Sequence, residues 1–392
     1  MRKVTILLML LCMVAGTNAQ KQKSLKQITK EVMERATVQY TNMASTLENG
    51  QAPRSYAKGK LITSNINWWC SGFYPGTLWY LYEYTGSEEL KNLAQAHTEM
   101  LAPLQYVKTD HDIGFQLFCS YGNGYRLTGN KNYLDVLHNG AMSLASRFNP
   151  VIGSIRSWDF SRDKWKFPVI IDNMMNLELL MWVGNYYDDP YLKNVAITHA
   201  NTTMRNHFRP DYSTYHLVNY DPENGEVIKK QTVQGYSDNS KWARGQAWAL
   251  YGFTMMYRMT SSTRYLEQAK HVADLLIPLL PEDGIPYWDF DAPDIPNDLR
   301  DASAGAIMAS ALVELSKYVP EKSELYRSTA ERQVRTLASS EYLAEVGTNG
   351  NFILKHGVGH KPSNGEVDVP LTYADYYFIE ALVRFNNLAQ QK

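Results

Sequence analysis

Two aspartates stand in sequence surroundings that alter the acid–base chemistry of a carboxyl group. Asp172 ends the apolar run Val169–Ile171, where desolvation raises the pKa of a carboxyl and keeps it partly protonated near neutral pH. Asp112 follows His111 and precedes Ile113–Phe115, whose central glycine permits close approach of a ligand or of backbone. A protonated carboxyl acts as a general acid, and two carboxyls are the minimum equipment for cleaving a glycosidic bond.

Asp112 and Asp172 could also have a structural or a metal-binding role. Aspartate is a common helix N-cap, so a purely structural role stays open for each aspartate at a helix start. His111-Asp112 could belong to a metal phosphohydrolase, but one His–Asp pair supplies too few ligands. No metalloprotease, serine-hydrolase, phosphate-loop or dinucleotide motif is present. We therefore expect neither a metal nor a cofactor.

The composition narrows the classes of ligand. The formal net charge is −1, which argues against a nucleic-acid surface. Aromatic residues make up 12% of the chain, with 27 Tyr and 9 Trp, and rings with a polar edge suit the faces of sugars. Cys70 and Cys119 lie beyond the N-terminal segment and allow at most one disulfide, and Cys70 is interpreted as a packed thiol.

The N-terminus has the three parts of a secretory signal. Arg2 and Lys3 precede the apolar run Val4–Ala15, and a small-residue cleavage motif follows. The run is shorter than the roughly 20 residues that cross a bilayer. We therefore expect residues 1–19 to be a signal peptide, residues 20–392 to form a single catalytic domain, and the protein to be secreted into the periplasm.

The elements that must position the two aspartates alternate in character. Five amphipathic helices open with a turn and a polar cap, and are anchored at Leu90, Leu134, Leu192, Leu266 and Leu325. A sixth spans Ser24–Ser45. Between them lie more uniformly apolar helices that begin near Trp69, Asp112, Asp172, Trp242, Asp301 and Pro370.

Six buried helices alternating with six amphipathic ones predict an all-α fold, an (α/α)6 toroid of six helical hairpins. The ring closes where the first helix meets the last. Because the inner helices run the same way, their N-terminal ends gather at one mouth, where helix dipoles and free N–H groups favour anionic ligands. Trp, carboxylate, Arg and His side chains occupy these helix starts.

Four blocks of sequence resemble the unsaturated glucuronyl hydrolases, glycoside hydrolase family 88. They are residues 111–115, 171–176, 240–248 and 301–304, and the similarity runs in order through the mature chain. In that family the substrate carries a C4–C5 double bond at its non-reducing end, left by a polysaccharide lyase, and the enzyme hydrates this enol ether. The resemblance implies that Asp172 transfers protons, as acid at C4 and base toward the water. Asp112 would be the second essential carboxylate.

The resemblance also implies a set of substrate-binding residues. Trp69, Trp242 and Trp248 would stack on sugar faces. Arg244 would offset the uronate charge, while His111, His216 and Gln234 would hydrogen-bond the ring or the water. The segment 357–370 resembles a loop that reads the next sugar and its sulfate, with Lys361, Ser363 and Asn364 as contacts.

The implied partners are unsaturated products of chondroitin, heparin or hyaluronan lyases, with no nucleic acid and no membrane. The sequence leaves two alternatives open. One is an unsaturated rhamnogalacturonyl hydrolase, which acts on pectin fragments with the same ring fold and chemistry. The other is a non-catalytic sugar-binding toroid, although both aspartates are present. The preference for sulfated substrates also stays open.

Overall fold

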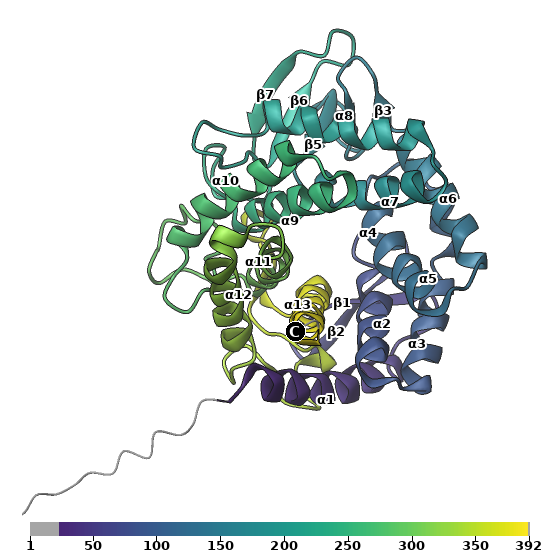
Figure 1. The fold of residues 1–392 in the computed structure, drawn as a ribbon, viewed down its shortest axis with the longest axis vertical. Coiled ribbons are helices and arrows are strands. Elements are labelled where there is room, and N and C mark those ends of the chain that lie inside the picture. Colours follow the sequence, from purple (N-terminus) through teal and green to yellow (C-terminus); the bar gives the residue numbers. More distant parts are fainter. Residues whose placement is uncertain (1–22, 391–392) are drawn as a thin grey trace, which may run out of the picture.

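The computed structural model describes residues 23–390, and the predicted signal peptide lies outside the described residues. Within that range, no helix combines the length and the apolar character needed to cross a membrane. The described chain forms a ring of helical hairpins, which confirms the predicted toroid (Figure 1).

The inner ring is made of the predicted apolar helices. Its members are α2 (Phe73–Thr85), α4 and α5 (Ile113–Leu117 and Asn123–Thr128, joined by a π-helical turn), α7 (Asn173–Tyr186), α9 (Ala243–Thr260), α11 (Ala302–Leu315) and α13 (Thr372–Gln390). The outer helices are α1 (Leu25–Ala44), α3 (Glu88–Glu99), α6 (Asn132–Ala145), α8 (Pro190–Asn206), α10 (Thr263–Leu279) and α12 (Ser323–Leu337).

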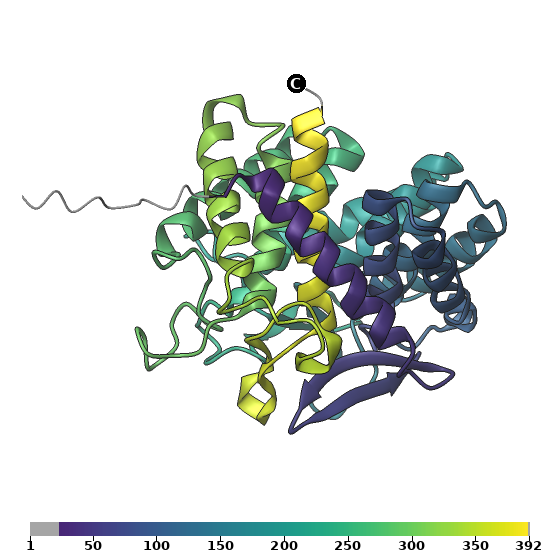
Figure 2. The same ribbon diagram turned by 90° about the horizontal axis from the view of Figure 1, so that it is seen from below.

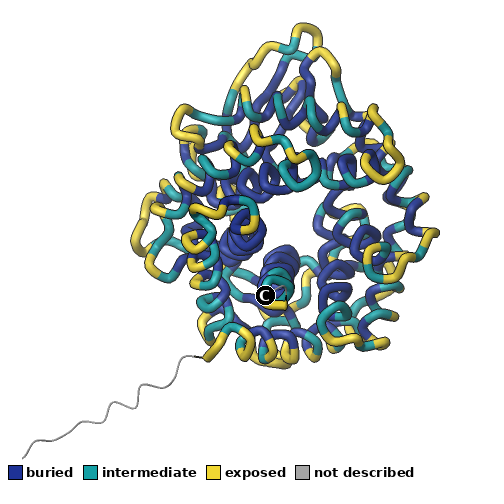
Figure 3. The backbone as a smooth tube through the Cα atoms, in the orientation of Figure 1, coloured by how far each residue is buried: buried dark blue, intermediate teal, exposed yellow. Residues whose placement is uncertain are grey.

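The inner helices contact one another in a closed cycle, because α13 packs against both α11 and α2. Outside them, α1 contacts α13, α12, α2 and α3, so the first helix closes the ring against the last, as predicted. Burial follows the same division. Every residue of α11 is buried, and Figure 3 shows buried inner helices with exposed residues toward the periphery.

The predicted side-chain caps are present on three of the outer helices, α1, α3 and α8, whereas α6, α10 and α12 begin without one. Ser24 and Gln27 form a capping box on α1, and the Ser87 side chain caps α3. Two predicted anchors were wrong by one position. Leu325 is 46% exposed and Leu266 is only partly buried, whereas the neighbouring Tyr326 and Tyr265 lie in the core. One residue turns a helix by about 100°, so the bulkier tyrosine faces inward.

Nine short strands supplement the described helices and were not predicted. They pair antiparallel as β1 (Gln51–Ala57) with β2 (Lys60–Asn65), β3 (Phe148–Asn149) with β4 (Ser154–Ile155), β6 (Leu217–Tyr220) with both β5 (Phe167–Ile170) and β7 (Val227–Gln231), and β8 (Gly357–His360) with β9 (Gly365–Val369). Figure 2 shows the β1–β2 hairpin and the β8–β9 region away from the C-terminal end of α13. Strands and loops thus surround the mouth where the inner helices begin.

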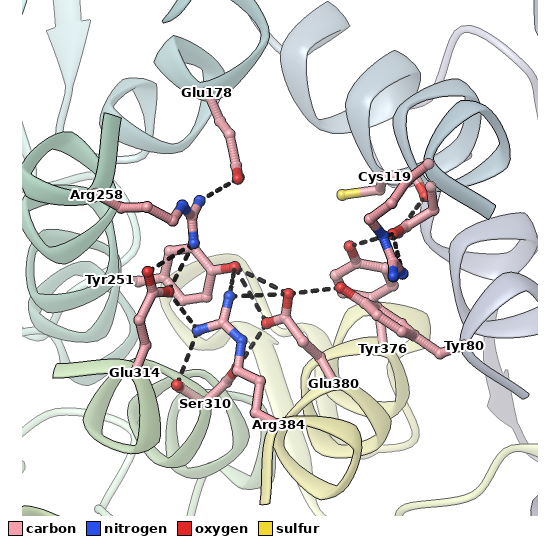
Figure 4. A network of polar contacts seen from close by, with 12 residues as sticks. Tyr80, Cys119, Glu178, Tyr251, Arg258, Ser310, Glu314, Tyr376, Glu380 and Arg384 are labelled. Carbon is pink, nitrogen blue, oxygen red and sulfur yellow. Dashed lines mark hydrogen bonds and ion pairs between the residues drawn. The ribbon is translucent and has the colours of Figure 1, made fainter. Parts of the chain in front are cut away.

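The other half of the ring's interior holds an ion-pair network (Figure 4). Arg258 of α9 binds Glu178 of α7 and Glu314 of α11, the latter at 2.7 Å. Arg384 of α13 lies 2.7 Å from Glu314 and 3.2 Å from Glu380. These groups are largely withdrawn from water, so each charge depends on its partners. The network joins four inner helices side by side.

Cys70 and Cys119 are both buried free thiols. Burial raises the pKa of each thiol well above its usual value, which disfavours the reactive thiolate. Cys70 is thus a packed thiol, as the sequence indicated, and the described chain has no disulfide.

Candidate active site

A pocket of about 460 Å³ opens at the mouth where the inner helices begin. Its wall combines helix starts with strand and loop residues. The sequence-predicted residues that line it are Trp69, His111, Asp112, Asp172, His216, Gln234, Arg244 and Ser363. These eight residues come from seven separate places in the chain, so the fold brings most of the predicted site together.

Asp172 occupies the N-cap position of α7, but its side chain makes no capping hydrogen bond. Its Oδ2 atom is buried, has no hydrogen-bond partner among the described residues, and lies 3.8 Å from Nε2 of His216. Burial raises the pKa of Asp172 to about 6, against the opposing effect of the Arg244 charge. A carboxyl in this state can hold a proton near neutral pH and deliver it to a bound molecule.

Asp112 also occupies an N-cap position, on α4, without capping the helix through its side chain. Its Oδ1 atom accepts a hydrogen bond of 3.3 Å from Asn176 of α7. Burial, and then the negative charge of Asp172, raise the pKa of Asp112 to about 7. The two carboxyls therefore interact, and between about pH 6 and 7 one of them holds a proton while the other is ionised.

Asp301 shows the structural role that the sequence left open for every aspartate. Its carboxylate caps α11 by accepting hydrogen bonds from the backbone N–H and hydroxyl of Ser303. It also accepts the N–H of Val358, and it does not line the pocket. Of the three aspartates at N-cap positions of inner helices, only Asp112 and Asp172 present their carboxyls to the pocket.

His216 is held in one orientation beside Asp172. Its Nδ1 atom accepts hydrogen bonds from the backbone N–H groups of Val233 and Gln234, at 3.0 and 3.3 Å. The proton of the neutral ring is thereby assigned to Nε2, the atom that faces Asp172. Burial, followed by the positive charge of Arg244, lowers the pKa of His216 well below its usual value. His216 is thus a neutral hydrogen-bond donor at the pocket.

Two of the predicted stacking residues do not reach the pocket wall. Trp248 is fully buried and packs against Phe115 and Tyr377 at centroid distances of 5.2 and 5.4 Å. Trp242 is 3% exposed and lies against the His216 ring at 4.6 Å. Both indoles form the layer behind the site, so their placement favours support of its side chains over stacking on a sugar. Trp69 does line the pocket.

Arg244 is 2% exposed, and its guanidinium N–H groups donate hydrogen bonds to other parts of the protein. Its Nη1 and Nη2 atoms donate to the carbonyls of Val358 and Gly359, at 2.5 and 2.7 Å. These bonds hold β8 against the start of α9. Arg244 thus fixes one wall of the pocket in addition to placing a positive charge near Asp172.

Sequence reasoning missed several lining residues because they come from the strands and loops. Arg54 of β1 and Glu366 of β9 form an ion pair of 2.5 Å across the mouth, and Arg54 lies 3.9 Å over the ring of Trp68. Glu366 has a left-handed φ of 54°. No local pattern links two residues so far apart in the chain. Further residues missed in this way are Asn67, Trp158, Phe160 and His360.

Asp110 was also missed, although its place beside His111-Asp112 was a usable signal. Asp110, His111 and Asp112 form the one group of three potential metal ligands found between residues 23 and 390, with their ligand atoms within 4.8 Å of one another. Burial raises the pKa of Asp110 to about 6, and its Oδ1 atom accepts the N–H of Asp112. A carboxyl with a raised pKa that already accepts the backbone N–H of Asp112 is a poor metal ligand. The expectation of a metal-free site stays a prediction.

Known proteins share this fold over most of the chain. The chain is 48% identical over 323 residues to an unsaturated glucuronyl hydrolase of Formosa agariphila, covering 82% of this chain and 80% of that one. It is 33% identical to an unsaturated chondroitin disaccharide hydrolase of Streptococcus agalactiae, over 91% of both chains. A crystal structure of an unsaturated glucuronyl hydrolase specific for heparin matches with a TM-score of 0.91 and 48% identity, over 93% of this chain and 98% of that one.

A family model extends this likeness over residues 20–390, which include Asp112, Asp172 and the helices that these residues begin. The protein belongs to Glycosyl Hydrolase Family 88 and is a glycoside hydrolase.

Proposed function

We propose that this protein hydrolyses oligosaccharides whose non-reducing end is a 4,5-unsaturated uronic acid, the product of glycosaminoglycan lyases. The observation that carries the proposal is the pair of pocket carboxyls. Asp112 and Asp172 both have raised pKa values, of about 7 and about 6, and neither caps its helix. A pair that shares a proton near neutral pH can donate it while the ionised partner offsets the positive charge that develops.

The reaction begins at the enol ether rather than at the anomeric carbon. Asp172 transfers its proton to C4, and positive charge develops on C5 and the ring oxygen. The two pKa values belong to the coupled pair, and the reactive form is the one in which Asp172 holds the shared proton and the Asp112 carboxylate stabilises the developing charge. A water then adds to C5 and loses a proton to the ionised Asp172, so the acid is restored. The resulting hemiketal opens, and the rest of the saccharide leaves with a free hydroxyl while the uronate becomes a keto acid.

The surrounding side chains support these steps. Nε2–H of His216 lies on the side of Asp172 where the water would be held, 3.8 Å from Oδ2. Trp69 offers an aromatic face in the pocket wall. Heparin lyase products are the first substrates to test, because the solved structure that is 48% identical is described as specific for heparin.

The experiment is turnover of an unsaturated heparin disaccharide in heavy water. Enzymatic hydration delivers deuterium to one face of C4 of the released uronate, which NMR of the early product detects. Displacement at the anomeric carbon instead releases an enol, whose C4 takes up deuterium from the solvent on both faces, so a label without facial selectivity would overturn the mechanism. A saturated disaccharide is the control, since it has no double bond to protonate and is expected to remain uncleaved. Preferential cleavage of unsaturated pectin fragments would support the rhamnogalacturonyl alternative instead.

We also propose that the protein is exported to the periplasm after removal of residues 1–19. The basic start, apolar run and small-residue motif of the sequence support this. Mass spectrometry of the protein recovered from a periplasmic extract should give a chain that begins at Gln20. A chain retaining Met1 in the cytosolic fraction would contradict the proposal.

A further inference from the structure

The segment Arg156–Phe160 contributes to two hollows in the surface. Trp158 and Phe160 line the catalytic pocket, whereas Arg156 and Asp159 line a second hollow of about 700 Å³. We call the second hollow the basic cleft. It is formed by Lys108, Ser146–Val151, Arg156, Asp159, Arg162 and Phe167. The catalytic chemistry uses none of these residues.

The basic cleft concentrates positive charge. Four cationic side chains, Lys108, Arg147, Arg156 and Arg162, line it together with a single carboxylate, Asp159. All three arginines pair with that carboxylate, at 3.0, 3.4 and 3.2 Å respectively. One negative charge cannot neutralise them, so the cleft keeps an excess of positive charge in a protein whose net charge is −1.

Arg147 is built into the floor of the cleft. It is 8% exposed, and its Nε and Nη1 atoms donate to the carbonyls of Arg156 and Lys108. Its Nη2 atom is buried and has no hydrogen-bond partner among the described residues. A buried guanidinium donor without a partner is costly to maintain. An anion in the cleft would offset the charge of this guanidinium, because Arg147 shares the single Asp159 carboxylate with Arg156 and Arg162.

Mutual repulsion among the cations supports the same conclusion. Burial lowers the pKa of Arg156, and the charges of Arg162 and Arg147 act in the same direction although Asp159 opposes them. A tetrahedral oxyanion offers several acceptor oxygens and negative charge, which matches the fork geometry of guanidinium groups.

The size of the cleft favours a ligand larger than a free ion. Its volume lies within the range of pockets that take small organic ligands. Val151, 55% exposed, and Pro150 provide apolar surface beside the arginines, and the C–H faces of a sugar can pack on such surface. We propose that the basic cleft binds a sulfate group carried on a saccharide chain. The saccharide part rests on the proposed function, whereas the charge of the cleft does not.

Binding is tested by calorimetry with a sulfated, saturated heparin tetrasaccharide, its desulfated counterpart and inorganic sulfate. The variant is Lys108→Ala/Arg162→Ala, which removes two exposed cations of the cleft. Its matched control is Lys164→Ala/Lys166→Ala. This variant removes two exposed cations that follow Arg162 in the chain but do not line the cleft. We expect the first variant to bind the sulfated saccharide at least about tenfold more weakly, and the control to bind as the parent does.

The remaining measurements distinguish a sulfated saccharide from free sulfate as the ligand, and the basic cleft from other cationic surface. The desulfated saccharide should bind at least about tenfold more weakly than the sulfated one, and KM for an unsulfated unsaturated disaccharide should stay unchanged in both variants. Equal affinity for inorganic sulfate and for the sulfated saccharide would overturn the saccharide assignment. Equal weakening in the control would overturn the site. If the parent protein cleaves no unsaturated substrate, the proposed function is wrong, but the binding isotherms still show whether the basic cleft binds a sulfated saccharide.

Discussion

At the scale of single residues, the chemistry depends on where one proton sits. Asp172 and Asp112 lie at equivalent positions of neighbouring inner helices, yet their surroundings differ. Asp172 faces the Nε2 atom of His216, whereas Asp112 is held by Asn176. Because the charge of Asp172 also acts on Asp112, the pair behaves as one acid–base unit.

Replacing Asp172 with Asn should abolish most turnover while leaving the fold intact. The amide keeps the shape of the side chain but cannot donate a proton to C4. General acid catalysis contributes roughly 10²–10⁴-fold, so kcat should fall by at least about 100-fold. Steady-state kinetics on an unsaturated disaccharide measures the loss, and an unchanged unfolding midpoint serves as the control. A loss below about tenfold would exclude Asp172 as the general acid.

The dependence of kcat/KM on pH should be bell-shaped, with its limbs near the pKa values of the pair, about 6 and about 7. Below the lower value both carboxyls are protonated and no carboxylate is left to stabilise the developing charge. Above the higher value the last proton leaves and no acid remains.

Histidine does not account for these limbs. Burial lowers the pKa of His111 to about 4 and lowers that of His216 well below its usual value, so both rings are neutral across this window. The residual activity of His216→Gln should therefore keep the alkaline limb. An alkaline limb that vanishes in this variant, or activity that persists above about pH 9 in the parent, would contradict the assignment.

At the scale of elements, close packing of α4 on α7 sets the position of Asp112. A Cβ atom on Gly114 would lie 2.4 Å from Cα of Asn176 and 2.6 Å from its Oδ1 atom. That oxygen accepts the N–H of Phe115 at 2.8 Å. The glycine that the sequence associated with close approach is therefore needed for the approach of two helices, and only through them for the ligand.

Gly114→Ala should lower both stability and kcat, because α4 must move away from α7 and take Asp112 with it. Overpacking of this kind costs about 1–3 kcal/mol in unfolding free energy. Gly140→Ala is the matched control. Its Cβ would meet the end of the Leu117 side chain at 2.3 Å, and a flexible side chain can shift without moving the site. Equal kcat values in the two variants would show that the α4–α7 contact does not position Asp112.

At the scale of the whole molecule, the ring is held at both ends by different means. Strands and loops surround the mouth, where Arg244 ties β8 to α9. In the other half of the interior, the ion pairs of Arg258 and Arg384 join α7, α9, α11 and α13. Buried charges of this kind stabilise the fold only while all partners are present.

Arg384→Met should destabilise the protein by about 3–5 kcal/mol, because it leaves Glu314 and Glu380 with fewer positive partners in the interior. Arg335→Met, which removes an i,i+4 pair on the outer helix α12, should change the unfolding free energy by no more than about 0.5 kcal/mol. Urea unfolding followed by circular dichroism measures both. A similar loss of unfolding free energy in the two variants would show that the interior ion pairs contribute no more to stability than an exposed pair does.

The sequence by itself determined the alternation of helices and singled out Asp112 and Asp172 as candidate acid–base residues. Helix caps and apolar periodicity are local properties, so Ser24 and Ser87 mark helix starts without reference to the rest of the chain. The consistent direction of the inner helices then brought Asp112 and Asp172 to one mouth.

Only the tertiary structure decided which side chains face the pocket. It assigned Asp301 to capping, placed Trp242 and Trp248 behind the wall, and paired Arg54 with Glu366 across the mouth. It also gathered four cations around Asp159. The physical reason is that these outcomes depend on packing between segments distant in the chain. Local propensity does not encode such packing, and a rotation of one residue along a helix reverses the face a side chain presents.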